Sequence, residues 1–212
     1  MPLYRFRRYL GDRLVLFIHI PKTGGASVEH MLKAAGGRQA LWSRARVPGA
    51  CSFQHMHAEM LSACFPKGFC DLTFAVCRNP YDRIFSEYKS RTIQKNNDVD
   101  FEAWFDLALA EYSKSNFFAD NHMRPQHEFV MENCLVYKME EGLGHALNNV
   151  SRRLGIRPPR RTVHHNRIDH PPVSIRSETQ RRILSLYQRD FEVLGYDPDD
   201  FARSFKPSAI HR

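Results

Sequence analysis

A basic, glycine-containing loop near the amino terminus carries the residues best suited to bind an anion. Lys22, Gly24 and Gly25 follow an apolar run, residues 14–18, whose β-branched and aromatic residues are typical of a strand buried on both faces. Pro21 ends this strand because proline cannot donate to a sheet, and apolar residues then recur at helical spacing. Free amides at the start of that helix, together with the lysine charge, would bind a phosphate or sulfate group.

Two other interpretations of this loop remain open from its residues alone. The segment also suits an ordinary strand–helix turn with a solvated lysine. A kinase or another nucleotide-binding protein would share the strand–loop–helix pattern, but the usual nucleotide loop, G-x-x-x-x-G-K-[ST], ends on its lysine. Lys22 instead precedes both glycines, and no clear magnesium-binding carboxylate follows the second predicted strand.

An arginine and a serine occupy the next predicted strand–helix junction. Residues 71–77 predict a second buried strand, Asn79 suits a helix cap, and Pro80 suits the first helical position. Arg78 would lie at the carboxyl end of the strand, where open α/β sheets bind ligands, and a guanidinium binds a phosphate through two hydrogen bonds. Ser86, about two helical turns on, adds a hydroxyl donor. A salt bridge and an ordinary helix residue are the structural alternatives.

Histidines that could accept a proton flank this junction. His55 and His57 precede a helical pattern, and a neutral imidazole can act as a general base near pH 7. Two histidines at this spacing could also start a zinc site, but no further ligands at suitable spacing lie nearby in the sequence. His122 and Arg124, within residues 121–126, could bind a sulfate or an acidic acceptor, or could belong to a loop packed by its proline.

Four segments together resemble sulfotransferases related to heparan sulfate 2-O-sulfotransferase and to the chondroitin and HNK-1 carbohydrate sulfotransferases (sulfotransferase family 2). The segment FIHIPKTGGAS resembles their 5′-phosphosulfate loop, and RNPYDRIFSEY resembles their 3′-phosphate element. NHMRPQ is similar to a segment near their active-site cleft, and YQRDFEVLGY to their carboxyl-terminal signature. The resemblance covers residues 14–196.

The resemblance implies an α/β fold of the P-loop type, a three-layer αβα sandwich around a central, mostly parallel sheet. We expect one domain over residues 1–212, with a core from about residue 14 to residue 196, a short basic amino-terminal lead and a carboxyl-terminal tail. The implied reaction moves a sulfo group from 3′-phosphoadenosine-5′-phosphosulfate (PAPS) to a hydroxyl group and leaves adenosine 3′,5′-bisphosphate. No metal is expected, because lysine and backbone amides would supply the positive charge.

The resemblance also assigns roles to individual residues. Lys22 would neutralise the leaving phosphate, and His55 would be the general base, with His57 as a second candidate. Ala26 stands where family loops commonly carry threonine or serine, so one hydroxyl contact is missing. His122 and Arg124 are candidate acceptor contacts. The donor-binding residues would be Lys22, Thr23, Gly24, Gly25, Ala26, Ser27, Arg78 and Ser86.

Length, charge and composition narrow the choice of partners. The chain has 212 residues and a net charge of +8, which suits an anionic donor or acceptor. No apolar run approaches the roughly 20 residues of a membrane span, and no apolar signal core follows the basic start, which favours a cytoplasmic bacterial protein. Five cysteines without a C-x-x-C pair predict free thiols.

The partner expected from the resemblance is a hydroxylated acceptor, a glycan or another sugar-containing molecule, and not a nucleic acid. A non-catalytic module that binds polyanions remains an alternative, and its binding would be salt-sensitive but independent of Lys22 and His55. The basic, proline-rich residues 157–172 are expected to form a loop that closes over the donor. Its candidate contacts are Arg160, Arg161, His165, Asn166 and Arg167.

Overall fold

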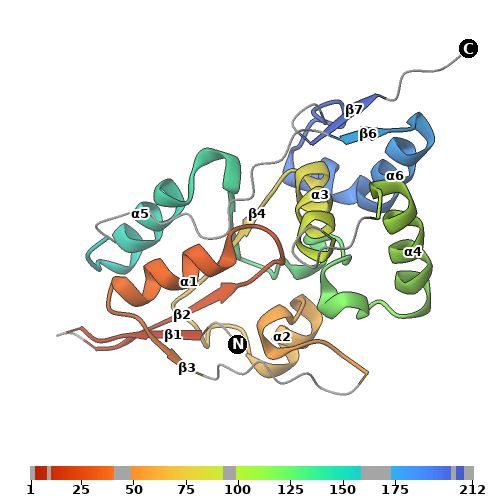
Figure 1. The fold of residues 1–212 in the computed structure, drawn as a ribbon. Coiled ribbons are helices and arrows are strands. Elements are labelled where there is room, and N and C mark those ends of the chain that lie inside the picture. Colours follow the sequence, from red (N-terminus) through yellow and green to blue (C-terminus); the bar gives the residue numbers. More distant parts are fainter. Residues whose placement is uncertain are drawn as a thin grey trace, which may run out of the picture.

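A five-stranded sheet forms the centre of the molecule. The computed structural model describes residues 3–8, 11–40, 49–92, 99–158, 173–201 and 204–207. The strand order is β3-β1-β2-β4-β5 (Figure 1). β2 pairs in parallel with β4, and β4 with β5, whereas β1 is antiparallel to both β2 and β3. All strands of this sheet except β1 therefore run in one direction. Their bounds are β1 Leu3–Phe6, β2 Arg13–Ile18, β3 Arg38–Ala40, β4 Leu72–Cys77 and β5 Leu135–Lys138.

Helices and short helical turns cover both faces of this sheet, so the predicted α/β layering is confirmed. Side chains alternate along each strand, and Phe17 and Phe74 pack beneath α1 (Gly25–Ala34) and α5 (Leu143–Leu154). On the opposite face, Ile18 packs with residues of α2 (Ala58–Cys64) and of the 3₁₀ helix η4 (Gln126–Phe129). Burial on both faces explains why β2 and β4 are continuous apolar runs.

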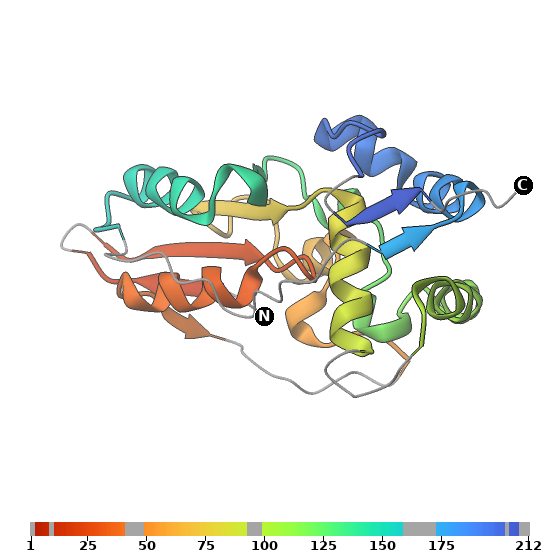
Figure 2. The same cartoon turned by 45° about the horizontal axis from the view of Figure 1, so that its top comes forward.

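A second, largely aromatic core lies beyond the carboxyl ends of the parallel strands (Figure 2). It joins α3 (Pro80–Arg91), α4 (Phe101–Lys114) and α6 (Ser177–Leu194). β6 (Val173–Ile175) and β7 (Phe205–Pro207) form a small parallel sheet beside these helices. Three further 3₁₀ helices complete the described elements: η1 Phe53–His55, η3 Phe118–Asn121 and η5 Met139–Glu141. No helix in the described ranges is long and apolar enough to cross a membrane.

The expectation of a basic amino-terminal lead was wrong. Leu3, Tyr4 and Phe6 are buried, and β1 lies in the interior of the sheet between β2 and β3. Its four residues contain an arginine and stand next to two more, which hid the apolar pattern. The carboxyl-terminal tail likewise contributes β7, in which Phe205 is buried.

Two sequence predictions lie outside the described residues. One is the strand expected near Leu41 and Trp42, although a short strand, β3, ends just before it. The other is most of the loop expected over residues 157–172, including the candidate contacts Arg160, Arg161, His165, Asn166 and Arg167.

Candidate active site

The loop between β2 and α1 has the backbone geometry of an anion-binding turn. Lys22 has a φ of 68° and Gly24, the cap of α1, a φ of 82°, so both lie in the left-handed region. A Cβ atom at Gly25 would lie 2.1 Å from Nε2 of His19, and therefore only glycine fits there. The first amides of α1 have no partner inside the helix and are free to bind an anion.

Side chains of this loop divide into those that hold the loop and those that remain accessible. The hydroxyl of Thr23 is fully buried and donates to the carbonyl of Ile20 at 2.9 Å. Ser27 is buried, whereas Ala26 is exposed. Lys22 is half-buried, and burial lowers its pKa while the nearby carboxylate of Glu87 acts in the opposite direction.

Arg78 joins this loop to the end of β4. Its Nη1 donates to the carbonyl of Lys22 at 3.4 Å, and its backbone amide donates to Oε1 of Gln126 at 2.9 Å. Asn79 caps α3 as predicted, because its side chain accepts from the amide of Tyr81. Ser86 is half-buried on α3, and none of the hydrogen bonds among the described residues joins it to Arg78.

Three imidazole rings lie in a row beside the loop. The ring centroids of His19 and His55 are 5.1 Å apart and those of His55 and His122 are 4.9 Å apart, with the rings nearly perpendicular in both cases. In each ring Nδ1 faces a carboxylate oxygen. A carboxylate can only accept, so the proton lies on Nδ1, and Nε2 keeps a free lone pair. The pairs are His19–Glu29 at 2.7 Å, His55–Asp120 at 2.8 Å and His122–Glu87 at 2.6 Å.

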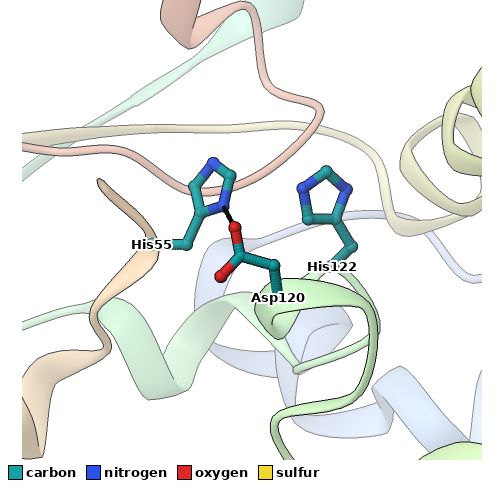
Figure 3. A group of neighbouring side chains, drawn as sticks. All are labelled: His55, Asp120 and His122. Atoms are coloured by element: carbon teal, nitrogen blue, oxygen red, sulfur yellow. Dashed lines mark hydrogen bonds and ion pairs between the residues drawn. The ribbon is translucent and has the colours of Figure 1, made fainter. Parts of the chain in front are cut away.

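His55 is the central ring of this row. Its side chain is 11% exposed, and Figure 3 shows one ring nitrogen bonded to Asp120 while the other points away from the carboxylate. Burial lowers the pKa of His55 to about 4, against the opposing effect of Asp120. The imidazole is therefore neutral near pH 7, which is the form that can accept a proton.

Asp120 is held in place by the start of η1. The Ser52 hydroxyl donates to its carboxylate at 2.9 Å, and the Ser52 amide donates to it at 2.5 Å. Burial alone would raise the pKa of Asp120, but the hydrogen bonds from His55 and Ser52 outweigh burial and hold it well below its usual range. Asp120 is thus an ionised acceptor that fixes the His55 tautomer.

A left-handed turn presents Asp120 and His122 to His55. Ala119, Asp120 and Asn121 have φ angles of 54°, 63° and 64°, a conformation that costs non-glycine residues about 1–3 kcal/mol each. Surrounding contacts stabilise the turn: the Asn121 amide donates to the carbonyl of His55 at 2.8 Å, and Arg124 Nε donates to Asn121 Oδ1 at 3.0 Å. Strain of this kind, held by other contacts, is typical of functional sites.

Arg83 ties this turn to the donor loop. Its guanidinium is almost fully buried and donates to the carbonyls of Pro21 at 3.0 Å, and of His122 and Arg124 at 2.9 Å each. The site therefore depends on a third residue of the R-N-P-x-x-R-x-x-S segment, to which the sequence interpretation gave no role.

Comparison with known proteins agrees with this geometry. A family model described as the sulfotransferase family matches residues 9–197, most of the chain. The chain belongs to the sulfotransferase family. Membership supports a transferase that moves a sulfo group, but it does not single out heparan sulfate, chondroitin or any other acceptor. No curated protein and no solved structure gives a significant match.

Of the two candidate bases in this sulfotransferase, only His55 lies in the histidine row. His57 is buried, its Nδ1 has no hydrogen-bond partner among the described residues, and its Nε2 lies 3.6 Å from the exposed Glu59. Its ring lies beside Phe117 at a centroid distance of 5.9 Å. The structure thus separates two histidines that the sequence could not rank.

The two candidate acceptor contacts also separate. His122 is half-buried within the row, whereas Arg124 is buried and bonded internally. Its guanidinium pairs with Glu128, donates to Asn121 and lies over the ring of Phe117. Arg124 therefore shapes the turn of Asp120 and is not accessible as an anion contact.

Sequence reasoning missed all three carboxylates of the histidine row and also His19. His19 lies inside the quoted FIHIPKTGGAS segment, and Glu87 inside RNPYDRIFSEY, so both could have been noted there. Asp120 directly precedes the NHMRPQ segment, and nothing in its local pattern marks it.

Proposed function

We propose that this protein transfers a sulfo group from PAPS to a hydroxyl group of a carbohydrate acceptor, with His55 as general base. The observation that carries the proposal is the His55–Asp120 pair, which leaves a neutral imidazole nitrogen free beside an anion-binding loop. The family shows the transfer chemistry at a coarser level. The donor, the acceptor and the residue roles are our proposal.

The donor would bind across two strand–helix junctions. Backbone amides of Thr23, Gly24 and Gly25, with Ser27, would hold the 5′-phosphate. Arg78 and Ser86 would bind the 3′-phosphate, and the hydrogen bond from Arg78 to the Lys22 carbonyl supports this, because it holds the two junctions together. Ala26 offers no hydroxyl, so we expect the backbone amides and Lys22 to dominate donor binding.

The reaction would be an in-line displacement at sulfur. PAPS supplies the sulfo group: the acceptor oxygen forms a bond to sulfur as the bond from sulfur to the phosphate oxygen breaks. Nε2 of His55 takes the acceptor proton, and Asp120 stabilises the resulting imidazolium through Nδ1–H. Lys22 neutralises the charge that develops on the leaving phosphate. The negative donor would also raise the low pKa of His55 toward neutrality, which strengthens the base.

The acceptor would approach along the histidine row. His122 carries the same carboxylate pairing as His55, and its free Nε2 could orient a second hydroxyl of the acceptor. A sugar, with several hydroxyl groups, suits such a pair of acceptors. The expected cytoplasmic, bacterial origin stays a prediction.

Calorimetric titration with adenosine 3′,5′-bisphosphate tests the donor site. The wild type should bind the bisphosphate more tightly than 5′-AMP or ATP, and Arg78→Ala should remove that preference. Tighter binding of ATP would favour a nucleotide-dependent kinase instead. Salt-sensitive polyanion binding that is unchanged in Lys22→Ala and His55→Ala would favour the non-catalytic module.

A further inference from the structure

Three side chains at the candidate active site form a donor set suited to a transition metal. One ligand atom each from His55, Asp120 and His122 lies within 4.8 Å of the others (Figure 3). Two imidazoles with one carboxylate are a common ligand set for zinc. Tetrahedral bonds of about 2.0–2.2 Å would bring these atoms to roughly 3.4 Å, so modest side-chain rotations would close the site.

The surroundings of these ligands match those of metal-binding histidines. A histidine that binds a metal almost always donates its other ring N–H to a carboxylate or carbonyl. His122 donates Nδ1–H to the buried carboxylate of Glu87 at 2.6 Å, which leaves Nε2 as its ligand atom. Figure 3 shows the His122 ring facing the other two side chains. Asp120 is in turn oriented by two hydrogen bonds from Ser52.

We propose that His55, Asp120 and His122 bind a divalent first-row transition ion such as Zn²⁺, and that the bound ion inhibits the enzyme. Imidazole ligands favour zinc, copper or nickel over magnesium and calcium, which prefer oxygen alone. The site is distinct from the proposed reaction, which needs no metal. Only the inhibitory consequence rests on the proposed function.

Inhibition follows whichever nitrogen of His55 binds the ion. Coordination through Nε2 uses the lone pair that would take the acceptor proton. Coordination through Nδ1 moves the ring proton to Nε2, so the imidazole stays neutral overall but becomes a donor there. In both cases His55 can no longer act as a base.

Charges around the cluster set the limits of this affinity. Glu87 and Asp120 favour a cation at the cluster, whereas Lys22 and Arg91 act on His122 as nearby positive charges and oppose one. Phosphate groups bound at Lys22 would screen that charge. We therefore expect the ion to bind more tightly when adenosine 3′,5′-bisphosphate is present.

Zinc titration by calorimetry, with and without the bisphosphate, tests the site directly. We expect one ion to bind to the wild type, with affinity at least about tenfold lower in His122→Ala and in His55→Ala. Glu87→Gln, which removes the outer hydrogen bond, should lower affinity by about 10–100-fold. His145→Ala, a change at an exposed histidine of α5, is the matched control and should leave affinity unchanged. Co²⁺ should give the intense visible absorption of a tetrahedral site.

Equal zinc affinity in the wild type, His122→Ala and His55→Ala would overturn the inference and assign the binding to other histidines. Thermal melts identify a variant that has failed to fold, and the two histidine variants alter different segments, so one of them suffices. The bisphosphate titration separates this result from the proposed function. Retained bisphosphate binding without a zinc site refutes the inference alone, whereas loss of bisphosphate selectivity in the wild type refutes the donor assignment alone.

Discussion

Asp120→Asn tests the role of the His55–Asp120 pair most directly. The substitution keeps the size of the side chain, and its carbonyl oxygen can still accept from the Ser52 amide. The side-chain amide group of the new asparagine, however, would face Nδ1 of His55 as a donor, so the ring proton would move to Nε2. His55 would then present a donor to the acceptor hydroxyl, and the base would be lost.

The expected loss follows from what a general base contributes. Positioned general bases accelerate reactions by about 10²–10⁴-fold, so kcat should fall by that factor, equivalent to about 2.7–5.4 kcal/mol in activation free energy. Loss of the charge-assisted hydrogen bond should also lower the free energy of unfolding by about 1.5–3 kcal/mol. Donor binding should hardly change, because Asp120 contacts neither the loop nor Arg78 among the described residues.

The assay measures sulfo transfer from PAPS at saturating donor, beside bisphosphate titration and thermal melting. Asp106→Asn is the matched control, since Asp106 is an exposed carboxylate on α4 paired with Arg182. The control should retain full turnover. If Asp120→Asn binds the bisphosphate normally and turns over within a few-fold of the wild type, His55 is not the base and the reasoning fails.

Three further predictions follow from the same contacts. Gly25→Ala should abolish bisphosphate binding in calorimetry and lower the melting temperature, because its Cβ would collide with His19; unchanged binding would show that the loop can move. His57→Ala should keep kcat within about threefold, since burying one unpaired polar atom costs stability and not rate; a loss of 10²-fold or more would make His57 the base. The pKa of Glu87 is held at about 2, because the effects of His122 and Arg91 exceed that of burial. A lowered carboxyl pKa adds stability that is complete above the unfolded value of about 4.3 and is lost as pH falls toward 2, so acid unfolding over that range should be shallower in Glu87→Gln; identical pH profiles would contradict the pairing.

Local sequence patterns predicted the elements that position the donor. The strand before the loop, the strand before Arg78 and the Asn79 cap all depend on contiguous residues, and each was confirmed. β1 was missed because a four-residue strand with a central arginine has too few positions to show a period. Its burial comes from pairing with β2 and β3, which are separated from it in the chain.

The sequence by itself determined the family, the α/β fold and the donor loop, because each of these is encoded by short runs of neighbouring residues. Only the tertiary structure decided which histidine has a carboxylate partner. Asp120 lies 65 residues from His55, and Glu87 lies 35 residues from His122, so no spacing in the chain relates them. Buried Arg83 and the left-handed turn at residues 119–121 bring these segments together. Burial and pairing then select the protonation states that the proposed chemistry requires, and both are properties of the folded chain.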